Sequence, residues 1–196
     1  VTVLELIRAL CRLGYHIPDH AVRAGIGKTR WPGRFSCIGE SPVFILDGAH
    51  NEDAALKLRE SVEAYFPGRR LICIMGVFRD KEYERIAQIM GPLASSVYTV
   101  DLPDRERGLP SEELAAVLEK YSSCVKRPDR YSQVERMCAA EAGDERESAQ
   151  RASVDRAVRA ALLEAGEEDV ILAFGSLSYL HQVKEAYERG VRDDRS

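Results

Sequence analysis

Polar side chains gather in one short turn, Asp47-Gly48-Ala49-His50-Asn51. The turn follows the apolar run Val43–Leu46, which suits a buried strand, and it precedes a helical pattern. Ligands of open α/β sheets bind outside the carboxyl ends of strands. Asp47 can accept hydrogen bonds from ribose hydroxyls or an ammonium, and Gly48 lets a bound group approach the backbone. His50 can donate, accept or stack. The turn predicts a binding site, although Asp, Gly and Asn also favour turns for purely local reasons.

The second chemical element is the string Trp31-Pro32-Gly33-Arg34, which ends thirteen residues before Asp47. Its Pro-Gly pair predicts a connector. An arginine on a connector can grip a phosphate with its planar guanidinium. The alternative is a surface arginine beside a tryptophan anchored in the core.

Two further strand ends carry polar residues. Gly175-Ser176 follows the apolar run Val170–Phe174, so backbone amides and the Ser176 hydroxyl meet at another strand end. Helix capping by Ser176 is the simpler interpretation. Beyond a third apolar run, Arg79 and Lys81 could bind a carboxylate or phosphate, or could form only a solvated helix start.

Other common sites are not expected. The dinucleotide fingerprint G-x-G-x-x-G is absent, and Gly25–Thr29 lacks the spacing of a phosphate-binding loop. His16, His20 and His181 have no partners at metal-ligand spacing. The five cysteines form no C-x-x-C pair and are odd in number. Free thiols in a reducing cytoplasm are therefore predicted, and neither a disulfide framework nor a zinc site.

Strands and helices that alternate along the chain must position these residues. Strands are predicted at Phe35–Ile38, Val43–Leu46, Arg70–Met75, Val97–Val100, Ser123–Val125 and Val170–Phe174. Helices are predicted at Asp53–Tyr65, Lys81–Met90, Ser111–Tyr121, Ser153–Ala165 and Ser178–Arg189. Apolar strands separated by helices indicate a mostly parallel sheet of about six strands, covered on both faces. The expected fold is a Rossmann-like, three-layer αβα domain.

The two ends of this pattern differ from its middle. Helices are predicted at Val3–Leu13 and about His20–Gly25, followed by a connector over Gly25–Gly33, so we expect a boundary near residue 30. The strongly charged segment Lys126–Arg151 predicts a surface excursion outside the active region. Within it we expect a helix around residues 131–142 and then a flexible stretch over Gly143–Glu147.

Composition excludes several classes of protein. The chain has 196 residues, of which 45% are hydrophobic, and a formal net charge of -4. This charge argues against bulk attraction to nucleic acid or to an anionic membrane. The apolar runs are too short to span a bilayer. The chain begins with Val1 and not methionine, as expected of a piece of a longer protein.

The sequence resembles the linker and C-terminal domain of folylpolyglutamate synthase and dihydrofolate synthase, which belong to the Mur ligase superfamily. The resemblance rests on the strings at residues 31–34 and 47–51 and on Gly175-Ser176-Leu177, which occur in the same order as in that family. Residues 1–30 are similar to the helical tail of the family's central ATPase domain and its linker, and 31–196 to its C-terminal domain. Two positions depart from the family: Glu52 replaces a frequent proline, and Ser178 stands before Tyr179, which leaves the equivalence of that tyrosine open.

The resemblance implies an ATP-dependent amide ligase of folate metabolism. Such an enzyme uses ATP and Mg²⁺ to phosphorylate a folate or dihydropteroate carboxylate, and the amine of L-glutamate then attacks the acyl phosphate. This chemistry depends on orientation and on electrostatic clamping of phosphate.

The resemblance also assigns roles to residues. It implies that Arg34 contacts the ATP phosphates, that Asp47 contacts the nucleotide, and that His50 lines the adenine or glutamate site. Ser176 and Lys81 are expected to bind glutamate, and Arg34 and His50 are the expected catalytic residues. No metal ligand is expected here. ATP and Mg²⁺ would be held mainly by an N-terminal ATPase domain outside this chain, so the isolated chain is expected to be inactive.

Two alternatives stay open. One is another Mur-type ligase that uses a different acceptor or amino acid. The other is a non-catalytic Rossmann-like binding domain whose Asp47–Asn51 turn is only structural. Whether dihydrofolate synthase activity accompanies glutamate addition is not encoded in these residues.

Overall fold

The computed structural model describes residues 2–29, 31–104, 106–127 and 145–193. By its internal contacts the chain divides into two units, Val1–Pro32 and Gly33–Ser196, and each is described by itself.

The first unit is a pair of helices, α1 (Thr2–Arg12) and α2 (Asp19–Lys28). Neither helix has a buried residue, and large apolar side chains of α1 such as Leu6 lie in solvent. The predicted end of the second helix near Gly25 is wrong, because α2 continues to Lys28. Glycine weakens a helix by about 1 kcal/mol without ending it, and Gly25 and Gly27 both keep a negative φ here.

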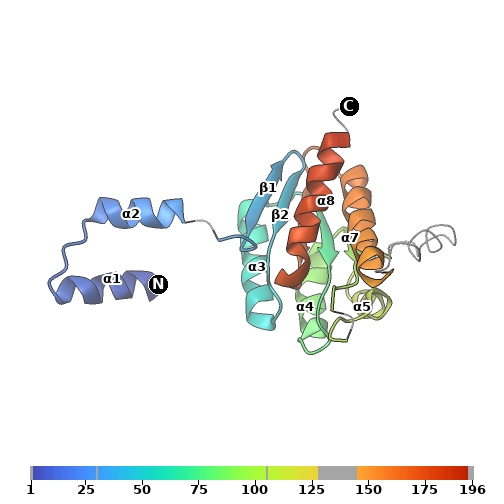
Figure 1. Ribbon diagram of the computed structural model, residues 1–196, viewed down its shortest axis with the longest axis horizontal. Helices are drawn as coiled ribbons and strands as arrows, with labels where there is room; N and C mark the ends of the chain where they lie inside the picture. The colour runs from blue at the N-terminus through green and yellow to red at the C-terminus, as the bar shows by residue number, and fades with distance from the viewer. Residues whose placement is uncertain (1, 30, 105, 128–144, 194–196) are drawn as a thin grey trace. The chain divides into compact units, whose positions relative to one another are not determined.

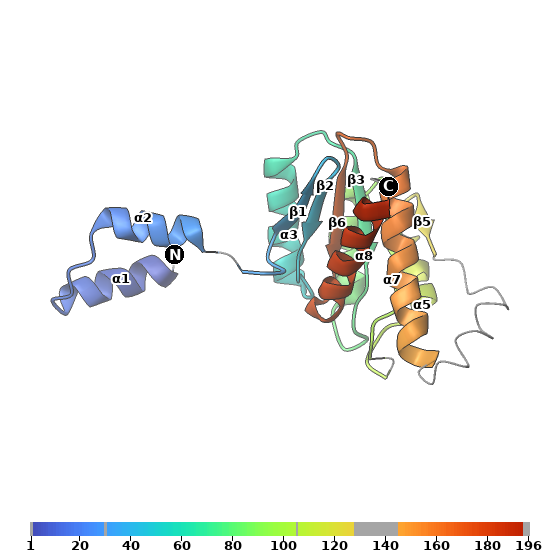
Figure 2. The ribbon, with the colours of Figure 1, turned by 45° about the horizontal axis from the view of Figure 1, so that its top comes forward.

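The second unit is built on a six-stranded sheet with the order β1-β2-β6-β3-β4-β5 (Figure 2). Strands β1 and β2 are antiparallel and all other neighbouring pairs are parallel, so the predicted mostly parallel sheet is confirmed. The strands are β1 (Ser36–Glu40), β2 (Val43–Leu46), β3 (Leu71–Met75), β4 (Ser96–Thr99), β5 (Val125–Lys126) and β6 (Val170–Phe174).

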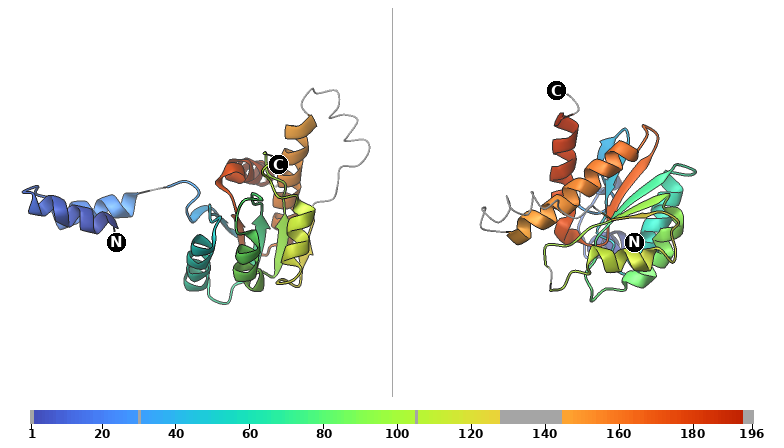
Figure 3. Two further views of the ribbon diagram at one scale, coloured as in Figure 1. Left: turned by 90° about the horizontal axis from the view of Figure 1, so that it is seen from below. Right: turned by 90° about the vertical axis from the view of Figure 1, so that its right-hand side faces the viewer.

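Helices cover both faces of this sheet (Figure 1). One face packs against α3 (Glu52–Tyr65), α4 (Tyr83–Met90) and α5 (Ser111–Leu118), and the other against α7 (Glu145–Glu164) and α8 (Leu180–Asp193), as the left view of Figure 3 shows. Successive side chains of a strand point to opposite faces. Thus Cys73 belongs to the first core, and its neighbours Ile72 and Ile74 to the second. The predicted three-layer fold is confirmed.

Two short 3₁₀ turns complete the second unit, η1 (Gly91–Leu93) and η2 (Leu177–Tyr179). Because η2 occupies the residues after β6, α8 begins two residues later than predicted. None of the described helices combines the length and apolar character needed to cross a membrane.

The charged segment is where the sequence predictions differ most from the structure. Residues 145–147 were expected in a flexible stretch, but helix α7 begins at Glu145 and includes them. Lys126 belongs to β5 and not to a surface excursion. A helix with one buried face carries charges on the other, and α7 buries Val154, Ala157 and Ala161. The helix predicted around residues 131–142 lies outside the described residues.

Candidate active site

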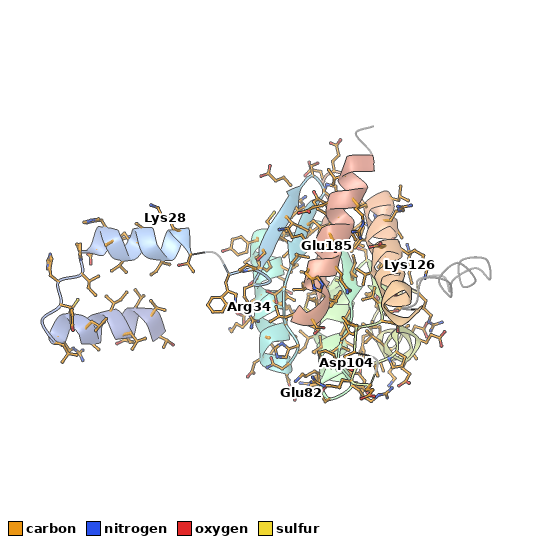
Figure 4. The ribbon with its side chains drawn as sticks, in the orientation of Figure 1. Lys28, Arg34, Glu82, Asp104, Lys126 and Glu185 are labelled. Atoms are coloured by element: carbon orange, nitrogen blue, oxygen red, sulfur yellow. The ribbon has the colours of Figure 1, made fainter. Side chains whose placement is uncertain are left out.

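The polar segments found in the sequence meet at the carboxyl edge of the sheet. Strand β6 lies between β2 and β3, so the segments that follow these three strands are neighbours. Figure 4 shows Glu82 and Asp104, which follow β3 and β4, at the same lower end of the unit. This edge is where open α/β sheets bind their ligands.

The Asp47 carboxylate is held by two backbone N–H groups. Its Oδ2 accepts from Phe35 at 2.7 Å and its Oδ1 accepts from Ala49 at 2.8 Å. The N–H of Gly48 donates to the carbonyl of Gly33 at 2.7 Å. The turn after β2 is therefore bonded to the residues on both sides of Arg34.

Phe35 adopts an uncommon backbone conformation, with φ at 43°. A positive φ is unfavourable for a bulky side chain and costs about 1–3 kcal/mol. The Phe35 ring packs against Tyr65 and Phe66, with centroids 5.6 and 6.2 Å apart. The hydrogen bond to Asp47 and this aromatic packing offset the strain. Phe35 carries no signal in the sequence, since no local pattern requires an aromatic residue in this conformation.

Leu177 brings the segment after β6 against the turn. Its side chain occupies the space beside Gly48, where any Cβ would collide with it, and it lies 2.8 Å from the Cβ position of Gly33. Leu177 is nevertheless 45% exposed. Its contact with two glycines could not be deduced from the sequence.

His50 is half-buried, and its Nδ1 lies 2.7 Å from the carbonyl oxygen of Gly48. A carbonyl only accepts, so this contact places a proton on Nδ1. In the neutral ring Nε2 is then the acceptor, and no described residue bonds it. Asn51 ends the turn as the N-cap of α3, with its side chain accepting from the N–H of Ala54 at 2.9 Å.

The segment after β6 places Ser176 in the interior. Ser176 is 4% exposed, and its Oγ accepts from the N–H of Ser178 at 3.2 Å and lies 2.9 Å from the Ser178 hydroxyl. Gly175 precedes it with φ at 112°, directly against the Gly76 carbonyl. The segments after β6 and β3 thus touch through two glycines.

The Tyr179 hydroxyl stabilises the ends of β6 and β3 by hydrogen bonds to their backbone. Its hydroxyl lies 2.6 Å from the carbonyl of Phe174 and 3.1 Å from that of Ile74, which joins β6 to β3. The residue is fully buried, and burial raises the pKa of its hydroxyl. Tyr179 is therefore a core residue in this chain.

Charged residues crowd the segment after β3. Lys81 pairs with Asp80 at 3.3 Å, and Asp80 also pairs with Arg107 at 3.4 Å. Arg79 forms a two-pronged pair with Glu113, at 2.9 and 3.1 Å, which lowers the pKa of that carboxyl. The segment reaches the start of α3, next to the Asp47–Asn51 turn, through Glu82, whose carboxylate accepts the N–H of Glu52 at 3.2 Å.

Arg34 is exposed beside the Asp47 turn, and Figure 4 shows it at the margin of the second unit. Its guanidinium bonds no described residue. Arg34 is therefore a cation free to meet an anionic ligand. Among the described residues, no group of three or more His, Cys, Asp or Glu side chains could hold a metal ion.

The described cysteines Cys11, Cys37, Cys73 and Cys124 are free thiols, and Cys138 lies outside the described residues. Burial raises the pKa of Cys73 to about 12, which makes it an unreactive core thiol.

Comparison with known proteins identifies the family of this chain. Residues 33–177 match the family model "Mur ligase, glutamate ligase domain". A probable bifunctional folylpolyglutamate synthase/dihydropteroate synthase of Halobacterium salinarum is 32% identical over 182 residues, which cover 92% of this chain and 19% of that protein. The chain thus spans about a fifth of the length of this relative.

Solved structures have the same fold. Escherichia coli FolC, in complex with DHPP and ADP, matches with a TM-score of 0.69 and 27% identity, over 96% of this chain and 38% of that one. A bifunctional folylpolyglutamate synthase/dihydrofolate synthase with Mn, AMPPNP and L-glutamate bound matches with a TM-score of 0.64 and 25% identity, over 89% and 35%. This chain belongs to the Mur ligase family, as a glutamate ligase domain.

Proposed function

We propose that this chain forms one wall of the active site of an ATP-dependent ligase that adds L-glutamate to folate through an acyl phosphate. The observation that carries the proposal is the junction of Gly33, Asp47 and Leu177, which joins the linker carrying Arg34 to two strand ends. Relatives bound to ADP, and to AMPPNP with L-glutamate, support the choice of ligands. The match to the glutamate ligase domain supports the choice of reaction class.

Each polar residue has a proposed task. Arg34 stabilises negative charge on the phosphate that is transferred, because its guanidinium is exposed and bonds no described residue. The Nε2 of His50 meets the adenine or the incoming glutamate, with its ring fixed through Nδ1. Asp47 contacts the nucleotide. Ser176 and Lys81 contribute to the glutamate site, and for Lys81 this requires exchange of its Asp80 partner.

The rest of the machinery is proposed to lie outside this chain. The described residues include no metal-ligand cluster, so Mg²⁺ is assigned to an N-terminal ATPase domain, together with most of the ATP site. The exposed apolar residues of α1 are proposed to pack on that domain. The whole protein would act in the cytoplasm, and the 196 residues alone are expected to ligate no glutamate.

The direct test is ATP-dependent ligation of glutamate by the full-length protein with Arg34→Lys. Lysine keeps the charge but loses the planar fork, so we expect kcat to fall about 10-fold or more. Arg59→Lys is the matched control, because Arg59 pairs with Glu63 on the outside of α3. Unchanged kinetics in both Arg34→Lys and Ser176→Ala would favour a non-catalytic binding domain.

A second candidate function is another Mur-type ligase, which the family match alone would also permit. Offering the full-length protein a folate and a muramoyl nucleotide as alternative acceptors separates the two. Product formation with the muramoyl nucleotide alone would overturn the folate assignment and leave the ligase chemistry in place.

A further inference from the structure

We propose that Asp47 is a positioning residue for Arg34: its carboxylate latches the backbone of Phe35 and so fixes the main chain on which Arg34 stands. The functional part of this inference rests on the proposed role of Arg34. It adds a task for Asp47 that direct contact with a nucleotide does not include.

The contacts of Asp47 support the latch. Both carboxylate oxygens accept backbone N–H groups, one from Phe35 and one from Ala49, at 2.7 and 2.8 Å. An ionised carboxylate that accepts backbone N–H groups forms charge-assisted hydrogen bonds. One side chain therefore ties the residue after Arg34 to the turn after β2.

The hydrogen bond from Phe35 to Asp47 matters because Phe35 has an unfavourable backbone conformation. With φ at 43°, Phe35 turns the chain sharply at the point where it enters β1. An aromatic residue keeps this conformation only where its surroundings enforce it. Loss of the bond to Asp47 would allow Phe35 to relax to a negative φ and would redirect the backbone of Arg34.

Two contacts on the other side of Arg34 complete the latch. The Gly33 carbonyl accepts the N–H of Gly48 at 2.7 Å, and the Gly33 N–H donates to the Ser36 hydroxyl at 3.1 Å. The side chain of Leu177 lies over both glycines. Arg34 thus stands between two fixed residues while its own side chain remains exposed.

Hydrogen exchange of the 196-residue chain tests the latch without any activity. Asp47→Asn replaces one acceptor oxygen by an NH₂ group, so we expect the amide of Phe35 or that of Ala49 to exchange about 10-fold faster or more. Leu177→Ala should speed exchange at Gly48 and does not alter the Asp47 charge. The matched control is Leu56→Ala on α3, where the residue is 42% exposed, and it should leave these amides unchanged.

A double-mutant cycle in the full-length ligase tests the function. Arg34→Ala is expected to lower kcat for glutamate ligation about 100-fold, and Asp47→Asn about 10-fold. If Asp47 acts on catalysis through Arg34, kcat of the double variant should match kcat of Arg34→Ala within about twofold, whereas a direct contact of Asp47 with the nucleotide raises KM for ATP in either background. Effects on kcat that multiply would show that Asp47 acts independently of Arg34 and would overturn the proposal.

If Asp47→Asn does not fold, Leu177→Ala provides a second variant that perturbs the latch. Its effect on kcat should likewise vanish in the Arg34→Ala background. If Arg34→Ala alone leaves kcat unchanged, the proposed phosphate role fails, and with it the purpose of the latch. Unchanged exchange at Phe35 and Ala49 in Asp47→Asn would overturn the latch whatever the kinetics show.

Discussion

Glu164 accepts a hydrogen bond from the Tyr98 hydroxyl at 2.7 Å, which joins the end of α7 to the middle of β4. The same carboxylate accepts from Ser96 at 2.8 Å and pairs with Lys126 of β5 and with Arg70. Its side chain is only 15% exposed. Glu164 thus connects a helix to β4 and to the edge strand β5, through residues 38 to 68 positions away.

This network predicts acid sensitivity. Burial opposes ionisation of Glu164, but hydrogen bonds from Lys126, Tyr98 and Ser96 outweigh it and lower the pKa to about 2. A pKa that is lower in the folded state adds stability above the ordinary glutamate pKa near 4.5, and this stability is lost as the pH falls towards 2. We expect Glu164→Gln to cost about 2 kcal/mol at pH 7 and to weaken the loss of stability between pH 4.5 and 2.

Denaturant unfolding of the 196-residue chain at several pH values measures both effects. Glu167→Gln is the control, because Glu167 is exposed and its carboxylate has no described partner. Equal stability of the wild type and Glu164→Gln at pH 7 would mean that the network contributes nothing.

The backbone conformation and close packing of Gly175 predict that adding one methyl group here lowers the stability of the fold strongly. Its φ of 112° disfavours any side chain, and a Cβ would collide with the Gly76 carbonyl. We expect Gly175→Ala to destabilise the fold by about 3 kcal/mol. Gly166→Ala is the matched control, since its Cβ would meet only Asp169 Oδ2 at 3.7 Å. Thermal unfolding compares the two, and equal melting temperatures would show that β6 and β3 can separate here at little cost.

The sheet could be predicted because its central strands are buried on both faces. Runs such as Val170–Phe174 contain no residue suited to solvent, and the structure buries all five. The strand ends were therefore located, and the polar turns with them. Lys126 was misplaced because its surroundings depend on Glu164, which lies 38 residues further along the chain. Composition cannot detect such a pair.

The site could be predicted only in part, for a related reason. Asp47, His50 and Ser176 follow strand ends and are visible as motifs, but their roles as binding residues stay a prediction. The conformation of Phe35 depends on an acceptor twelve residues away, and the position of Leu177 on two glycines in different segments. Residues that act through such contacts carry no signature of their own.

We expect the second unit to be as stable alone as it is in the complete chain. None of the described residues of α1 and α2 is buried, whereas the second unit has two hydrophobic cores of its own. We expect a chain of residues 33–196 to unfold in one cooperative transition, within about 2 °C of the complete chain. Calorimetry of both chains measures this. A large drop in melting temperature would mean that residues 1–32 stabilise the sheet domain.

Because the tautomer of His50 is fixed, the functions of its two ring nitrogens can be tested separately. Asparagine can replace the Nδ1–H donor to the Gly48 carbonyl but offers nothing at the position of Nε2. We therefore expect His50→Asn to change the melting temperature of the 196-residue chain by less than about 3 °C. In the full-length ligase the same variant should lower kcat/KM for ATP or glutamate about 10-fold or more. His50→Gln, which approximates the reach to Nε2, should retain more activity and less stability than His50→Asn. The opposite ranking of the two variants in activity would assign the function of His50 to its bond with Gly48.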